Sequence, residues 1–191
     1  MSVFVNSPLT RKLRPIMPFR VFVLLLSLAT VSPAGPADLK DVRILDDVTA
    51  TVNACPHFTI FDNVSVSVDQ GVVTLTGKVT MGYKVGELQK RVGAIPGVKQ
   101  VVDALEVLPA STLDDELRQQ IARAIYGNAN FWTYAAMRNP PIHILVDRSR
   151  VTLTGLVRSE VDRRLAQALA TQFNALSVTN ELRTDADARM P

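Results

Sequence analysis

The chain has 191 residues, 47% of them hydrophobic, which is enough for two modest cores but excludes a membrane protein with many spans. The net charge of +3 arises entirely in the first 34 residues, which hold four basic residues and no acidic one. The remaining 17 basic and 18 acidic residues give a net charge of −1. These numbers argue against nucleic-acid binding through a strongly basic face.

Residues 1–34 have the composition of a secretory signal peptide. A basic segment leads into an apolar run at 21–31, and small residues and prolines follow. Eleven residues are too few to span a bilayer, which takes about 20. We expect cleavage after Ala34 or Ala37 and export to the periplasm, with Met1 or Met17 as the start and an uncleaved anchor as the alternative. The apolar run does not end in a cysteine that could be lipidated.

An internal repeat organises the rest of the chain. Residues 73–79 read VTLTGKV and residues 151–157 read VTLTGLV, seventy-eight positions later. In both, apolar residues alternate with other residues, which is typical of a half-buried strand. A second alternating run precedes each copy, at 64–68 and 142–146, across a short turn-like link. Each pair therefore predicts a β-hairpin, and the chain is a duplication.

Helical periodicity flanks each hairpin. The pattern predicts a helix over 38–53, with Ile44, Leu45, Val48 and Val52 inward, and its counterpart carries Leu113, Leu117, Ile121 and Ile125 behind an N-cap at Thr112. After the hairpins, we expect one helix with a stripe of Val85, Leu88, Val92 and Ile95 and with Lys84, Glu87, Lys90 and Arg91 in solvent. In its counterpart Ser159 is the predicted N-cap, and Val161, Leu165, Ala168, Leu169 and Phe173 face inward.

A closing strand ends each copy, at 98–107 and 178–182. Asp103 and Asn180 lie between apolar residues at matching positions, and we expect each to bond to nearby backbone. The order in each half is helix, strand, strand, helix, strand. The fold class is therefore α+β, with two tandem αββαβ domains, each a small three-stranded mixed sheet with two helices on one face. We place the domains at 38–108 and 113–184, with a linker at 109–112 and a mobile tail at 185–191.

Glycines and aromatic residues mark the repeat further. Gly77 and Gly155 take inward positions on a strand, which predicts a bulge or the close approach of a packed helix. Phe58, Phe61 and Phe131 are expected to fill the cores. The second copy alone has about five extra residues at 135–141 and the unmatched Trp132.

Motifs of catalysis or of metal binding do not occur in the sequence: there is no G-x-S-x-G, H-E-x-x-H, phosphate loop or G-x-G-x-x-G. His57 and His143 lie at non-equivalent positions, and we expect His143 on the outer face of its strand. Cys55 is the single cysteine and is expected to be a buried thiol rather than a metal ligand. We therefore predict no enzyme, cofactor or metal.

The element order, the paired V-T-L-T-G strands and the closing V-x-[DN]-x-L pattern resemble the BON domain family. Gly77 and Gly155 match its characteristic glycine, and Gly97 matches the one before the closing strand. The resemblance implies a non-enzymatic envelope protein that associates with phospholipid or with other envelope components, in osmotic or envelope stress.

The second copy is the predicted binding site. Trp132 and the neighbouring Tyr134 would insert shallowly into an anionic phospholipid surface, and Arg138, Arg163 and Arg164 would supply positive charge. The alternative is a periplasmic chaperone or protein-interaction module that binds envelope proteins. Nothing in the sequence fixes the oligomeric state.

Overall fold

The structure, a computed structural model, describes residues 39–189. The predicted signal peptide, its cleavage sites and both candidate start residues lie outside that range. The two copies of the repeat belong to one unit, residues 35–191.

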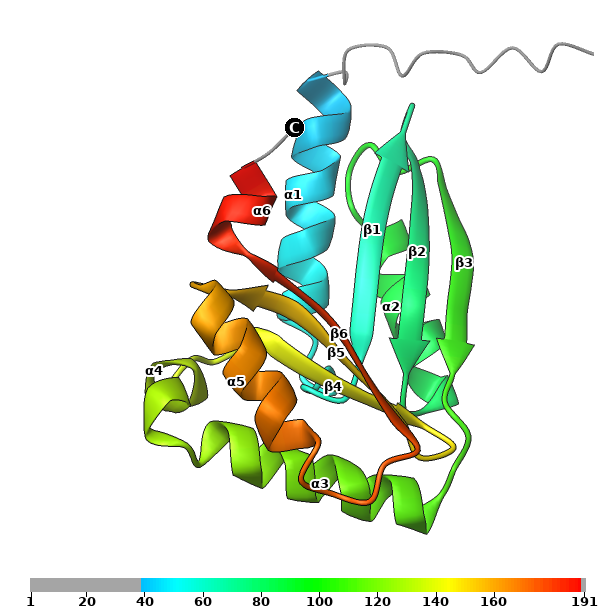
Figure 1. The fold of residues 1–191 in the computed structure, drawn as a ribbon. Coiled ribbons are helices and arrows are strands. Elements are labelled where there is room, and N and C mark those ends of the chain that lie inside the picture. The colour runs from blue at the N-terminus through cyan, green and yellow to red at the C-terminus, as the bar shows by residue number, and fades with distance from the viewer. Residues whose placement is uncertain (1–38, 190–191) are drawn as a thin grey trace, which may run out of the picture. The chain divides into compact units, whose positions relative to one another are not determined.

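Both copies fold into the predicted αββαβ order (Figure 1). In each, two antiparallel strands form a hairpin, and the closing strand pairs in parallel with the second strand, so the sheets are β1-β2-β3 and β4-β5-β6. The prediction of two tandem α+β domains with mixed sheets is confirmed. The first copy comprises α1 (Leu39–Asn53), β1 (Asn63–Asp69), β2 (Val72–Val79), α2 (Gly82–Gly93) and β3 (Gln100–Val107). The second comprises α3 (Thr112–Tyr126), η1 (Ala129–Phe131), α4 (Trp132–Ala135), β4 (Ile142–Asp147), β5 (Arg150–Val157), α5 (Glu160–Ala170), β6 (Ser177–Thr184) and α6 (Asp185–Arg189).

The hairpin turns are tight and are held by the preceding helix. Gln70 and Gly71 have φ of 50° and 81°, and Arg148 and Ser149 have φ of 50° and 60°, as two-residue type I′ turns require. In the first copy the carboxylate of Asp41 accepts hydrogen bonds from the backbone N–H groups of Gln70 and Gly71. Asp114 does the same for Arg148 and Ser149. Each first helix is thereby fastened to its hairpin turn.

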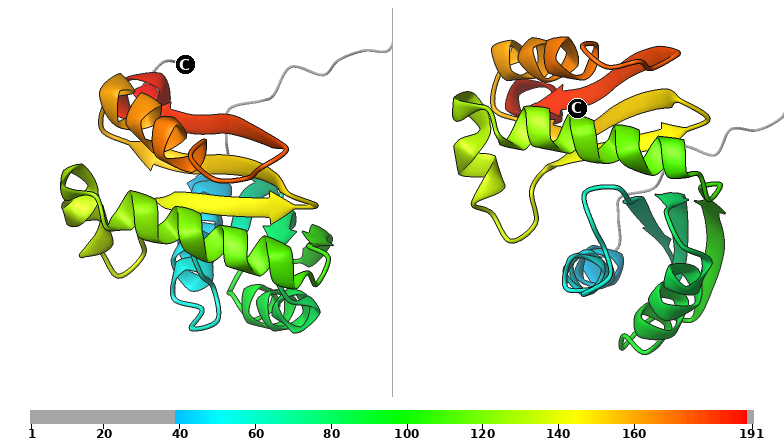
Figure 2. Two further views of the ribbon diagram at one scale, coloured as in Figure 1. Left: turned by 60° about the horizontal axis from the view of Figure 1, so that its bottom comes forward. Right: turned by 90° about the horizontal axis from the view of Figure 1, so that it is seen from below.

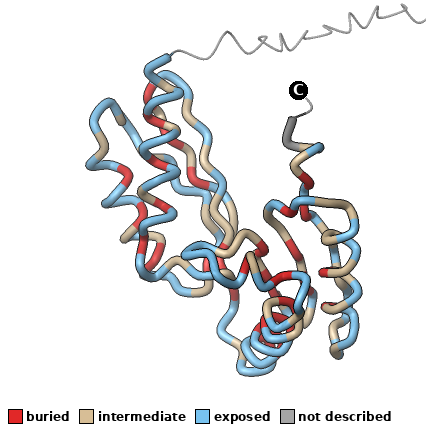
Figure 3. Tube along the Cα trace, turned by 90° about the vertical axis from the view of Figure 1, so that its left-hand side faces the viewer, coloured by how far each residue is buried: buried red, intermediate tan, exposed pale blue. Residues whose placement is uncertain are grey.

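One core lies between the helices and the sheet in each copy. Buried residues recur at intervals along α1, α3, β2 and β5 (Figure 3). α3 runs along β4 and α5 along β6 (Figure 2). Two residues predicted to face inward, Leu113 and Val161, are instead 73% exposed. Leu113 lies outside the core because the predicted positions are four residues apart. On a helix of 3.6 residues per turn, each such step rotates the side chain about 40° beyond a full turn, so Leu113 points away from the face that holds Ile121 and Ile125. On α5, Ala166 and Ala170 are fully buried in place of Val161 and the exposed Ala168.

Helix caps and the chain end differ in part from the prediction. Ser159 caps α5 as expected, through a bond to the N–H of Asp162, but α3 is capped by Ser111 rather than by Thr112. Residues of the predicted mobile tail form α6 instead. Thr184 and Asp187 exchange side-chain to backbone bonds, and this reciprocal cap explains why a helix starts there.

A buried ion pair lies in the first copy. Lys84, predicted to be in solvent, is 5% exposed, and its Nζ donates to Asp62 Oδ2 at 2.6 Å and to Thr80 Oγ1 at 2.7 Å. Asp62 is fully buried and also accepts from the N–H groups of Thr59 and Thr80. Burial alone would raise the pKa of Asp62, but these hydrogen bonds together lower it. The prediction for Lys84 was wrong because its ammonium group forms an ion pair with a buried carboxylate that is remote in sequence.

The two copies touch through the loop that follows α1. The backbone N–H of Ile144 on β4 donates to the carbonyl of Ile60 at 2.7 Å. Phe61, expected to fill the first core, packs with Ile60 against the core of the second copy. Phe58 does pack partly on its own core, and its ring centroid lies 5.6 Å from that of His143. A segment of one copy thus completes the packing of the other.

Candidate binding surface

Three large apolar side chains are exposed where α4 meets the start of α5. Trp132 is 67% exposed, Met137 46% and Val161 73%. Trp132 lies on α4, Met137 follows that helix within the extra segment, and Val161 lies in the first turn of α5. We call these three residues the α4–α5 surface.

Tyr134 and Arg158 hold α4 against α5. The hydroxyl of Tyr134 donates to Asp162 Oδ2 at 3.1 Å and accepts from the backbone N–H of Arg158 at 2.9 Å. The Arg158 guanidinium donates to Thr133 Oγ1 and lies 5.0 Å from the centre of the Tyr134 ring. Tyr134 is therefore only 3% exposed, and burial raises its pKa. It positions the surface and is not itself available to a membrane.

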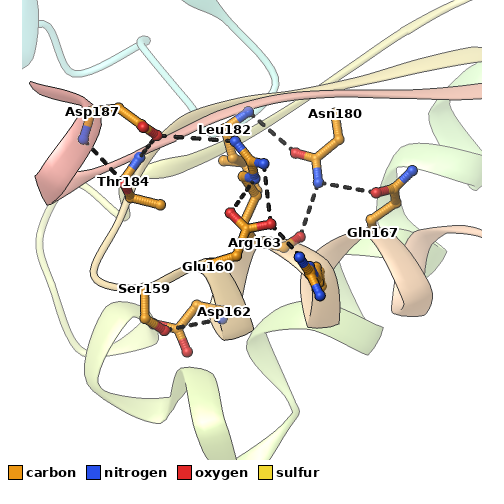
Figure 4. A network of polar contacts seen from close by, with 10 residues as sticks. Ser159, Glu160, Asp162, Arg163, Gln167, Asn180, Leu182, Thr184 and Asp187 are labelled. Atoms are coloured by element: carbon orange, nitrogen blue, oxygen red, sulfur yellow. Dashed lines mark hydrogen bonds and ion pairs between the residues drawn. The ribbon is translucent and has the colours of Figure 1, made fainter.

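The predicted arginines are not gathered in one place. Arg163 is held between Glu160 at 2.8 Å and Asp187 at 3.9 Å (Figure 4). Arg164 also pairs with Glu160, at 2.9 Å, although its side chain is 78% exposed. Arg138 is exposed, but it lines a cavity shared with the first copy. The exposure of Met137 and Val161 was missed, since nothing in a single sequence tells which apolar residues of a helical segment stay in solvent.

The backbone geometry explains why glycine occupies positions 77 and 155. Their φ values are +122° and +120°, a region that other residues rarely adopt. A Cβ at Gly77 would lie 2.2 Å from the carbonyl oxygen of Asn63, and one at Gly155 would lie 1.8 Å from that of Pro141. The close approach comes from the backbone beside the neighbouring strand, so the expected approach by a helix is wrong. The β1–β2 pairing runs through Gly77 to Lys78, and the β4–β5 pairing is continuous up to Gly155, its last pair, so neither hairpin has the expected bulge.

Asp103 and Asn180 bond to nearby backbone, as predicted. The N–H of Leu105 donates to Asp103 Oδ1 at 3.0 Å, and that of Leu182 donates to Asn180 Oδ1 at 3.2 Å. The Asn180 amide also donates to the carbonyl of Arg163 on α5 and to Gln167 (Figure 4). The motif thus joins the closing strand to the second helix.

The family model for the BON domain matches the chain twice, at residues 40–109 and 113–186. This chain belongs to the BON domain family. The resemblance seen in the sequence is confirmed, and BON domains are in general non-catalytic and suggest an envelope or membrane-associated role. A search of curated proteins found no match.

Two solved structures are similar to this pair of BON domains at low identity. One is described as CdsD, a structural protein of the type III secretion system of Chlamydia trachomatis, with 16% identity, a TM-score of 0.29, and coverage of 78% of this chain and 99% of that chain. The other is the C-terminal domain of CdsD, with 15% identity, a TM-score of 0.28, and coverage of 74% and 96%. TM-scores this low carry no argument about function.

The cysteine and the two histidines of the BON domains lie in different surroundings. Cys55 is buried, and His57 pairs with Glu87 at 2.8 Å and contacts the Tyr83 ring. His143, predicted on an outer strand face, is there but is largely covered by the first domain. Residues 39–189 contain no group of three side chains suited to a metal. Among the same residues, no helix has the length and apolar character to cross a membrane.

Proposed function

We propose that this protein is exported to the cell envelope and acts there by adhesion, with the α4–α5 surface of the second BON domain resting on an anionic phospholipid membrane. The observation that carries the proposal is Trp132, exposed by 67% on α4, with further exposed apolar side chains on the segment after α4 and in the first turn of α5. The predicted signal peptide supports export, and the family supports an envelope role without catalysis. The link to osmotic or envelope stress rests on the family resemblance and is part of the proposal.

The chemistry of the surface suits a membrane interface. An indole ring is apolar with one N–H donor, a combination enriched at the level of lipid head groups. Arg163 and Arg164 in α5 pair with Glu160, and Arg163 also pairs with Asp187. Arg158, just before α5, forms no ion pair with a described residue. Each basic residue close to an anionic leaflet contributes about 1 kcal/mol, so a single unpaired arginine implies weak, salt-sensitive binding.

Co-sedimentation of residues 35–191 with vesicles tests the proposal. We expect recovery with phosphatidylglycerol vesicles, little with phosphatidylcholine vesicles, and a loss in 0.5 M salt. Trp132→Ala should reduce the recovery several-fold. Tyr83→Ala is the matched control, because Tyr83 is an aromatic residue of the first domain with 58% exposure. Equal recovery of the wild type and both variants would refute membrane docking by this surface.

A second function, the binding of client chains, is favoured by the free edge of β1. The register with β2 turns the N–H and C=O groups of Val64, Val66 and Val68 away from the sheet, and they bond to no other described residue. Such an edge is a template for an added strand. Binding of unfolded polypeptides that is insensitive to lipid charge, together with no vesicle recovery, would favour this function over adhesion to lipid.

A further inference from the structure

An open cavity of about 660 Å³ lies at the junction of the two BON domains. The loop after α1 and the start of β1 contribute from the first domain, and the open face of the β4-β5-β6 sheet contributes from the second. The remaining wall is part of the extra segment, residues 138–141, which the first copy lacks. Asn139 fastens this wall to the first domain, because its Nδ2 donates to the carbonyl of Asn53 at 2.9 Å.

The lining of this cavity includes both flat apolar side chains and hydroxyl or amide groups. Phe58 and the Pro140–Pro141 pair supply the flat surfaces. Ser65, Thr154 and Asn63 supply groups that both donate and accept hydrogen bonds, and no side-chain bond is described for any of the three within residues 39–189. Walls of this kind complement a sugar ring, which has C–H faces and a rim of hydroxyls.

The charge of the cavity favours an anion. Arg138 and Arg183 face a single acid, Glu181. Arg138 makes no hydrogen bond or ion pair with a described residue, and Arg183 uses one N–H on the carbonyl of Asp187 at 3.2 Å. Burial lowers the pKa of His143, so this side chain is neutral at pH 7 and adds no positive charge. Both guanidiniums therefore keep donors for a carboxylate.

We propose that this cavity binds a short carbohydrate bearing a carboxylate, with its ring against Phe58 and the prolines and its carboxylate on Arg138. The volume lies within the range of about 300 to 1,000 Å³ found for small-molecule sites. The site requires both domains, and the extra segment of the second one builds its anion-binding wall. This inference is independent of membrane binding, because the α4–α5 surface contributes none of the lining residues.

Isothermal titration calorimetry with digalacturonate tests the proposal, with the neutral disaccharide lactose and inorganic phosphate as comparison probes. We expect digalacturonate to bind to residues 35–191 and the other two to bind at least tenfold more weakly. Arg138→Ala should weaken digalacturonate about tenfold, since a charge-assisted hydrogen bond is lost. Arg164→Ala is the matched control, because Arg164 is a well-exposed arginine of the same domain outside the cavity.

Ser65→Trp provides a second variant, in which a large ring enters the cavity from an exposed strand position of the first domain. It should abolish sugar binding and leave the thermal midpoint and vesicle recovery unchanged. No binding of digalacturonate at millimolar concentration would overturn the proposal. Equal affinities for the acid sugar and lactose, stronger binding of phosphate, or equal affinities of the wild type and Arg138→Ala would also overturn it.

Discussion

In both BON domains a side chain accepts a hydrogen bond from the backbone N–H group that precedes the second helix, but the accepting side chains differ. In the first, the buried carboxylate of Asp62 accepts from the N–H of Thr80 and is neutralised by Lys84. In the second, the equivalent N–H, that of Arg158, donates to the hydroxyl of Tyr134, which bonds in turn to Asp162. The fold needs a hydrogen-bond acceptor for this N–H group, but the acceptor can be a carboxylate or a hydroxyl. The first domain uses a charge pair that is costly to break, and the second uses hydrogen bonds that leave α4 free to carry Trp132.

The outer edges of the two hairpins differ as well. On β4, Ile142 exchanges hydrogen bonds with the Tyr126 hydroxyl, Ile144 donates to Ile60, and Val146 accepts from Arg118. At the positions of Tyr126 and Arg118, the first domain has Asn53 and Leu45, which make no such bonds to β1. Duplication thus produced one capped edge and one open edge, and the loop of the first domain is part of the cap.

Breaking the buried charge pair should have the largest effect. Lys84→Met leaves Asp62 buried without its counter-charge and should lower the free energy of unfolding by about 3 to 5 kcal/mol. Asp162→Ala, at the equivalent place in the second domain, removes one partly buried hydrogen bond and should cost about 1 kcal/mol. Urea denaturation of both variants measures the difference. Similar losses would mean that the two networks are energetically alike.

Substitution of the two strand glycines, Gly77 and Gly155, should have the next largest effect on stability. Gly155→Ala introduces a Cβ 1.8 Å from a backbone oxygen at a positive φ, and should destabilise by about 2 to 4 kcal/mol. Gly77→Ala should cost somewhat less, because its contact is 2.2 Å. Gly86→Ala on α2 is the control, since it meets open space and should stabilise by up to about 1 kcal/mol. Unchanged thermal midpoints in the first two variants would contradict this account of the glycines.

Acid should weaken the first domain through Asp62. Its folded pKa is lowered, so its contribution to stability is complete above its unfolded pKa of about 3.9 and is lost as the pH falls through the folded value. Asp62→Asn removes this titration and should lose less stability than the wild type between pH 5 and pH 2. Urea midpoints at both pH values give the comparison. Parallel losses in the two proteins would assign the acid sensitivity to other groups.

The smallest effect concerns the two strand edges. The amide of Val66 faces outward without a partner, whereas that of Ile144 donates to Ile60. Hydrogen exchange followed by NMR should be about tenfold or more faster at Val66 than at Ile144. Comparable protection at the two amides would indicate that a partner, such as a second chain, covers β1 in solution.

The repeat, the element order and the strand faces followed from the amino-acid sequence, because alternation and helical periodicity are local patterns and both occur in each copy. The sequence also located Asp103 and Asn180 correctly, since their bonds reach only two residues along the chain. Tertiary structure alone decided that Lys84 is buried against Asp62, that Tyr134 lies in the core, and that Phe61 packs against the core of the other domain. These outcomes depend on which surfaces meet after folding, and such long-range contacts leave no periodic signal in a single chain.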